Sequence, residues 1–206
     1  MVNRIVSVVA AAAFVGFVGP AGAQVAITAT TPTPTYEISV GYQLFRAGEV
    51  CGEDQIVGGE VVQTCRPDRV FPLGFAVDVA RNFGTLGLGV VGDFGWSHDS
   101  EDELSVTSWH LAGGLRWSGR KAGLSPFGQF LLGGVFNNFS DDVGTDFEGD
   151  NHFMLQPGGG VVFAAESGWG FVGQVDLRHV FLDEETSLAS SRNDLRVFLG
   201  IRLAFR

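Results

Sequence analysis

The sequence predicts an all-β protein, an eight-stranded antiparallel transmembrane β-barrel. Three observations lead to this fold class. Segments of about ten residues alternate apolar with small or polar side chains, glycine and phenylalanine are abundant, and acidic residues gather in every second connection. The chain of 206 residues has 30 glycines and 18 phenylalanines but a single lysine. A helical protein would instead carry Lys, Glu and Ala on its exposed faces, so many strands joined by turns are expected.

The last segment, 195–205, shows the alternation most clearly. One face is wholly apolar, whereas the opposite face mixes Gly, Ala and Phe with Arg196 and Arg202. That mixture suits a crowded polar lumen better than bulk water. Eleven residues are also enough to cross a bilayer at a tilt. The apolar face consists of Leu195, Val197, Leu199, Ile201, Leu203 and Phe205.

Seven earlier segments repeat this pattern, at 36–45, 71–80, 86–96, 108–117, 126–136, 154–164 and 169–181. In the second, the pattern places Phe71 on the outer face together with Leu73 and Phe75. In the fifth, Phe130, Leu132 and Phe136 outward is the better of two possible parities. The sixth contains Pro157, which cannot donate to a ladder, so a bulge or the barrel rim is expected there.

The connections indicate which end of the barrel faces outward. The connections 46–69, 98–105, 137–152 and 182–193 hold 17 of the 23 acidic residues, whereas 81–85, 118–125 and 165–168 hold only Glu166 beside Arg81, Arg120 and Lys121. Outer-membrane barrels have long outer loops and short periplasmic turns, so both chain termini are expected in the periplasm. Aromatic residues near strand ends fit interfacial belts: Tyr36, Trp96, Trp109, Trp117, Trp169 and Phe205.

Residues 1–23 are predicted to be a signal peptide. Arg4 precedes an apolar run from Ile5 to Gly19, and the small residues 21–23 form a cleavage site. Residues 24–35 are rich in Thr and Pro and are expected to be a flexible periplasmic lead-in, which leaves 36–206 as the barrel domain. The net charge of −10 argues against binding to nucleic acid.

From Tyr36 onward the chain resembles the small eight-stranded outer-membrane barrels of Gram-negative bacteria, the outer-membrane β-barrel or porin-like family. The last strand is similar to that family's assembly signal at Gly200, Leu203 and Phe205, although Arg206 follows the aromatic residue where the family usually ends. The resemblance implies an outer-membrane location, contact with membrane lipid and lipopolysaccharide, insertion by the barrel-assembly machinery, and a monomer.

Charged residues on the inward faces are the main candidate site. An eight-stranded barrel has an interior about wide enough for its own side chains, so these charges should pair across a plugged lumen. A packed polar core is favoured over a gate or ion path, because half-paired buried charges are costly. The acids are Glu37, Asp78, Asp93 and Asp176, and the bases are Arg116, Arg178, Arg196 and Arg202.

Other chemistry has weaker support. The four histidines, at 98, 110, 152 and 179, lack ligand spacing, so neither a metal nor another cofactor is expected. The acidic stretch 141–150 could hold a divalent cation but lacks the ligand order of a calcium loop. A lipid-modifying enzyme would need a His, a Ser and an acid together, and no motif links His179 to Glu185 and Ser187. A non-enzymatic structural or surface-interaction role is therefore predicted, with a small low-conductance porin and a lipid-modifying barrel as alternatives.

The two cysteines, Cys51 and Cys65, fall in the first long connection. Export carries them to an oxidising compartment, so a disulfide between them is predicted. Two free thiols or a pair held for a metal are the alternatives, and the second is weakened because no other Cys pair or His lies beside them.

Overall fold

The structure is a computed structural model that describes residues 34–51, 55–57, 60–62, 65–83, 87–101, 104–119, 123–141, 146–164, 168–182 and 189–205. The predicted signal peptide lies outside the described residues, as do positions 24–33 of the lead-in. Arg120, Lys121, Glu185, Ser187 and Arg206 lie outside them too. Within the described part of the chain, no helix is long and apolar enough to cross a membrane.

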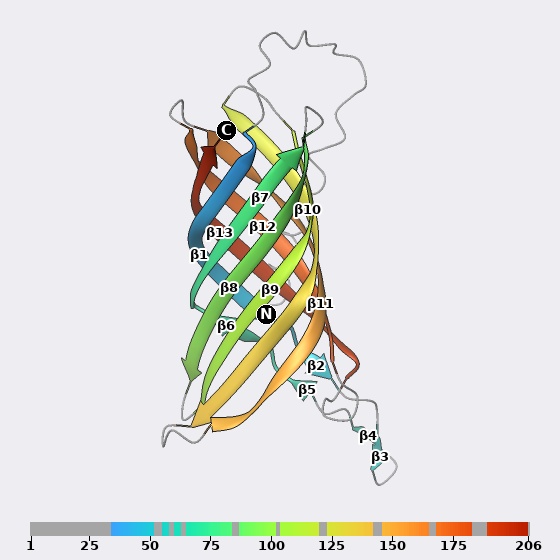
Figure 1. Cartoon of the computed structure of the whole chain (residues 1–206). Coiled ribbons are helices and arrows are strands. Elements are labelled where there is room, and N and C mark those ends of the chain that lie inside the picture. Colours follow the sequence, from blue (N-terminus) through green and yellow to red (C-terminus); the bar gives the residue numbers. More distant parts are fainter. Residues whose placement is uncertain are drawn as a thin grey trace. The chain divides into compact units, whose positions relative to one another are not determined.

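Eight long antiparallel strands form a closed barrel (Figure 1). Each strand pairs with the next along the chain, and the last pairs with the first from Tyr36 opposite Phe205 to Arg46 opposite Leu195. The strands are β1 (Tyr36–Ala47), β7 (Leu73–Phe83), β8 (Leu88–Glu101), β9 (Leu104–Ser118), β10 (Leu124–Asp141), β11 (Asp146–Ala164), β12 (Trp169–Phe181) and β13 (Ser191–Phe205). The predicted fold class is confirmed.

Five short strands occupy the connection between β1 and β7. β2 (Val50–Cys51) pairs with β5 (Cys65–Arg66), and β3 (Gln55–Val57) pairs with β4 (Glu60–Val62). β6 (Arg69–Phe71) extends the ladder of β1 at Phe45–Ala47. The first long connection therefore has strand structure of its own, which its Gly-rich and charged sequence did not indicate.

The alternation of exposure along the strands confirms the predicted lipid-facing side. On β13, Leu199 is 60% exposed while Phe198 is 1% exposed, and on β10 Phe130 and Leu132 are outside while Leu131 is fully buried. The fifth segment therefore has the predicted parity. Because side chains alternate with a period of two, one correct assignment determines all the others within an uninterrupted strand.

Phe71 was expected on the outer face, and the structure shows that this was wrong. Pro72 separates β6 from β7, so the alternation restarts at Leu73. Phe71 turns inward, is 4% exposed and packs on Phe45 with ring centroids 5.3 Å apart. A proline cannot donate to the ladder, which explains the interruption at that position.

Pro157 was expected at a bulge or a rim, and this was also wrong. It lies inside β11 opposite Phe130 of β10, and its side chain is exposed. The ladder between β11 and β12 has pairs at Leu155 and Gly158 in an unchanged register but none at 156 or 157. The strand therefore accommodates the proline through a local loss of pairing, without a shift in register.

Two connections predicted to be long are largely strand. β8 and β9 pair as far as Glu101 opposite Leu104, and β10 and β11 pair as far as Ser140 opposite Asp146, with one irregularity near Asn137. At the other end of the barrel, Gly87, Gly123 and Gly168 precede β8, β10 and β12 with φ of 72°, 73° and 81°. Glycine tolerates this left-handed conformation, which tight turns require.

The seam that closes the barrel depends on a pair of glycines. Gly41 of β1 lies opposite Gly200 of β13. A Cβ atom on Gly41 would collide with the backbone of Leu199 and Gly200, and one on Gly200 would lie 2.8 Å from the ring of Phe198. Only residues without a side chain allow the first and last strands to approach this closely.

Candidate functional site: the polar lumen

The centre of the lumen holds an ion cluster around Arg196, which we call the central cluster. Its Nη1 and Nη2 donate to the two carboxylate oxygens of Asp93 at 2.6 and 2.8 Å. Its Nε lies 3.1 Å from a carboxylate oxygen of Asp176, at ion-pair distance but without hydrogen-bond geometry. All three side chains are at most 1% exposed. A bidentate guanidinium pair of this kind is among the strongest polar contacts in proteins.

His110 completes the central cluster. Its Nε2 lies 2.5 Å from Asp93 Oδ1 and 2.9 Å from Arg196 Nη1. The nitrogen can donate to Asp93 when it carries a proton or accept from Arg196 when it does not, but it cannot do both. His110 was not predicted to belong to this site, and the inward parity of its strand was the only signal in the sequence.

A second group, which we call the turn-side cluster, lies toward the end of the barrel where β1 begins at Tyr36 and β13 ends at Phe205; we refer to these described strand ends as the termini. Arg116 pairs with Asp78 at 3.0 Å and also donates to Gln129 Oε1 from two nitrogens, at 3.0 and 2.7 Å. Arg202 pairs with Glu37 at 3.2 Å and donates to Ser39 Oγ at 3.0 Å. These two arginines both face the ring of Phe127, each with its guanidinium carbon 4.7 Å from the ring centroid.

Glutamines connect the two clusters. Gln174 donates to Asp176 Oδ2 at 2.7 Å, and Gln129 donates to Asp176 Oδ1 at 3.3 Å while accepting from Arg116. The predicted site contained charged residues alone, and the glutamines were not among them. The signal available was that Gln43, Gln129, Gln156 and Gln174 all fall on inward faces, and all four are buried.

Arg178 has a different environment from the other three lumen arginines. It donates to Gln156 Oε1 at 3.0 Å, and its guanidinium carbon lies 4.9 Å from the centroid of the Phe45 ring. Among the described residues no carboxylate is within ion-pair distance of it, and its Nη2 has no hydrogen-bond partner. The eight predicted lumen charges are all buried. Among the described residues, however, Arg196 forms ion pairs with two carboxylates and Arg178 forms none.

Apolar side chains fill the rest of the interior. One group surrounds the fully buried Leu131, Val135 and Met154, and a second includes Phe127, Val172 and Phe198. At the end away from the chain termini, Phe45 packs with Ala47, Phe71 and Val106. We call this last group the mouth cluster. Arg178 lies against Phe45, so buried apolar and charged side chains occupy this end of the described interior.

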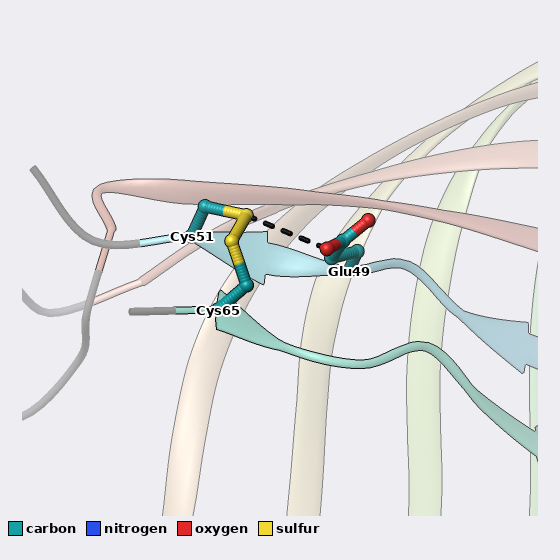
Figure 2. A group of neighbouring side chains, drawn as sticks. All are labelled: Glu49, Cys51 and Cys65. Atoms are coloured by element: carbon teal, nitrogen blue, oxygen red, sulfur yellow. Dashed lines mark hydrogen bonds between the residues drawn. A yellow bond between two sulfur atoms is a disulfide. The ribbon is translucent and has the colours of Figure 1, made fainter. Parts of the chain in front are cut away.

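Outside the lumen, Cys51 and Cys65 form a disulfide with an S–S distance of 2.13 Å, and Figure 2 shows Glu49 beside it. One carboxylate oxygen of Glu49 lies 3.6 Å from Cys51 Sγ, the contact drawn as a dashed line in Figure 2. A disulfide sulfur carries no proton to donate and is not a thiolate, and metal ions bind cysteine as the thiolate. The three residues therefore do not form a metal site while the disulfide is intact.

The remaining histidines are separate. His98 stacks on Trp96 and lies 3.0 Å from Thr107 Oγ1, whereas His179 lies 2.8 Å from Asn193 Oδ1 and packs edge-on against Phe181. Neither ring contacts a serine together with an acid among the described side chains. In the acidic stretch 141–150, Asp150 is the one acid whose side chain lies in the described part of the structure, and it is exposed.

The end away from the termini carries an open hollow of about 480 Å³. Two ion pairs border it, Arg69 with Asp99 at 2.6 Å and Arg46 with Asp68 at 2.8 Å. The hollow is lined by Asp68, Arg69, Val70, Pro72, Asp99 and Ser100.

The fold matches solved outer-membrane proteins, although no protein-family profile and no curated protein sequence matches the chain. Neisserial surface protein A superposes with a TM-score of 0.54 at 11% identity, over 83% of this chain and 97% of that one. OprG from Pseudomonas aeruginosa gives 0.53 at 10% identity, over 84% and 97%. Ail of Yersinia pestis, in complex with a heparin analogue, gives 0.50 at 18% identity, over 84% and 100%. With its closed antiparallel sheet and its apolar outer face, the chain is an eight-stranded β-barrel of the outer-membrane type.

Proposed function

We propose that the protein is a non-enzymatic, non-conducting outer-membrane barrel that acts through the surface at the end away from its termini. The observation that carries this proposal is the filled lumen. Arg116, Arg196 and Leu131, from three different strands, are at most 1% exposed, and apolar groups lie among the ion clusters. A plug of this kind stabilises a closed barrel and leaves the outer surface as the functional part.

The chemistry of that surface favours cationic partners. The four connections at this end contain 17 of the 23 acidic residues. Ail was crystallised with the heparin analogue sucrose octasulfate, which is a polyanion, whereas acidic connections would repel such a ligand. We propose instead that they bind basic protein segments, or divalent cations that bridge them to lipopolysaccharide.

Assembly is proposed to proceed through the last strand, with the barrel remaining a monomer. Gly200, Leu203 and Phe205 lie on β13, which is paired with β1 along its length. Leu203 and Phe205 are exposed on the lipid side, and they are the side chains that the barrel-assembly machinery could read before the seam closes.

Planar-bilayer recording tests the non-conducting role. We expect no discrete current steps from refolded protein whose insertion is verified by its altered gel mobility without boiling. Reproducible, ion-selective steps would contradict the proposal and support the alternative, a small low-conductance porin. One observation favours that alternative: several buried polar atoms lack partners, among them Gln156 Nε2 and Asp78 Oδ2, and water in the lumen would satisfy them.

A lipid-modifying activity is tested separately, by the mass of lipid A from cells that express the protein. We expect no change in mass, because the outward-facing His179 contacts Asn193 and Phe181 rather than a nucleophile and an acid. The loss or gain of an acyl chain, absent when His179→Ala is expressed, would overturn the non-enzymatic assignment.

A further inference from the structure

The outer surface near the chain termini carries an arginine held between two aromatic rings. Arg81 of β7 lies opposite Tyr36 of β1, and its guanidinium carbon is 5.7 Å from the ring centroids of both Tyr36 and Phe83. Both rings are outward, 44% and 48% exposed. Two flanking rings restrict the guanidinium and hold it at the level of the aromatic belt, where a bilayer's headgroups lie.

Among the described residues, this guanidinium has no counterion. Arg46, Arg69 and Arg192, toward the other end of the barrel, pair with Asp68, Asp99 and Asp194 at 2.6 to 2.8 Å. By contrast, no carboxylate of a described residue lies within ion-pair distance of Arg81, whose only side-chain contacts in the described part of the chain are the two rings. A guanidinium at a membrane interface that meets no anion among the described residues is free to pair with an anion of the membrane.

The level of the site within the bilayer follows from its neighbours. Phe205, the last described residue, is the other cross-strand partner of Tyr36, and Trp117 lies opposite Leu88, which is itself opposite Phe83. Phe205 is 47% and Trp117 54% exposed, so the ring pair around Arg81 lies at the same end of the barrel as other outward-facing aromatic side chains. The end with the short turns faces the periplasm in barrels of this type, and the leaflet on that side consists of phospholipid.

We propose that Arg81, held between Tyr36 and Phe83, is a binding site for the phosphate group of a phospholipid in the periplasmic leaflet. The fork of the guanidinium matches two phosphate oxygens, the two rings pack against the upper acyl chains, and the Tyr36 hydroxyl is an additional donor at the same level. The site fixes the depth of the barrel at this edge, and it is independent of what the opposite surface binds.

Lipid retention in native mass spectrometry tests the site. The protein is refolded in detergent with phosphatidylglycerol or with a galactolipid that lacks phosphate. We expect wild type to retain phosphatidylglycerol and not the galactolipid. The fraction of protein with bound phosphatidylglycerol should be at least threefold lower for Arg81→Gln than for wild type. Arg81→Lys should fall between the two, because a single ammonium cannot bind in the bidentate mode. Arg46→Gln is the matched control, since that outward arginine is already paired with Asp68.

Equal retention by wild type and Arg81→Gln would overturn the proposal, as would an equal loss in Arg46→Gln. Displacement of phosphatidylglycerol by equimolar lipopolysaccharide would overturn the assignment to the phospholipid leaflet. If Arg81→Gln does not refold, a measurement on the wild type decides the question. In vesicles of phosphatidylglycerol, solid-state NMR dephasing by ³¹P is expected at the Arg81 guanidinium and not at that of Arg46, and its absence at Arg81 would refute the site.

Discussion

Replacing Arg196 with methionine removes the cation of the central cluster while nearly preserving the volume of the side chain. Asp93 then loses both of its short contacts, at 2.6 and 2.8 Å, and keeps only His110. Asp176 loses the 3.1 Å ion pair and keeps its glutamine donors. Breaking a buried ion pair by removing one partner costs about 3–5 kcal/mol, because a buried charge is left uncompensated. Two carboxylates are affected here, so we expect a loss near the upper end of that range.

The measurement is urea unfolding in lipid vesicles, followed by tryptophan fluorescence. Arg46→Met is the matched control, because the Arg46–Asp68 pair is partly exposed, with side-chain exposures of 33% and 41%. Exposed pairs contribute about 0–1 kcal/mol, so the control should unfold close to wild type. The two variants should thus differ by about 3 kcal/mol or more.

Rescue distinguishes charge from packing. Adding Asp93→Asn and Asp176→Asn to Arg196→Met leaves the centre of the lumen uncharged, and we expect this triple variant to be more stable than the single one. A single variant that loses no more than Arg46→Met, or a triple variant less stable than the single, would refute the view that paired charge holds the lumen together.

Three further predictions test the lipid-facing side, the interrupted ladder and the disulfide. Leu199→Arg, on the outer face in the middle of β13, should lower folding stability in vesicles by about 2–4 kcal/mol, whereas Leu203→Arg near the strand end should lower it by about 0–1 kcal/mol. Equal losses of stability would show that the bilayer midplane has been misplaced. Pro157→Ala can restore a ladder hydrogen bond to β12 and should raise the free energy of unfolding by about 1 kcal/mol, while a loss of stability would mean that the strand requires the proline. Alkylation without reductant should add no mass at Cys51 or Cys65, and two added alkyl groups would refute the disulfide. The double variant with Cys51→Ser and Cys65→Ser should keep the gel shift of the unboiled protein, while its 46–69 connection becomes more sensitive to protease.

The barrel was predictable because its information is local and periodic. Each strand alternates side chains with a period of two, so Leu199 outside and Phe198 inside follow from sequence alone. The departures occur where a proline acts in a way that depends on its neighbours. Pro72 resets the alternation and turns Phe71 inward, whereas Pro157 leaves the register of β11 unchanged. Sequence shows that a ladder bond is lost at both positions but not which strand can accommodate the loss.

The lengths of the outer connections were less predictable. Acidic and polar residues between 98 and 105 suggested a loop, yet Ser100 and Ser105 lie opposite each other in the extended ladder with their hydroxyl oxygens 3.0 Å apart. Beyond the bilayer a strand can carry polar side chains on both faces, so the apolar alternation that marks its membrane part disappears while the strand continues.

The pairing inside the lumen could not be predicted, because it depends on which residues the register places side by side. Asp78 and Asp93 lie directly opposite each other on β7 and β8, and two carboxylates in that position repel. Each is therefore taken by a different arginine: Asp78 by Arg116, and Asp93 by Arg196, which comes from the opposite end of the sequence. Asp176 is the cross-strand neighbour of Arg196, so this arginine pairs with two acids. Arg178 lies opposite the buried Asp194, but Asp194 pairs with Arg192, and Arg178 is left with Gln156 and the Phe45 ring. The alternation of the strands shows which charges point inward, but only the register of the closed barrel determines which arginine pairs with which acid. Among the described residues Arg178 has no carboxylate within ion-pair distance, and it lies against Phe45 of the mouth cluster, at the end of the barrel proposed to act.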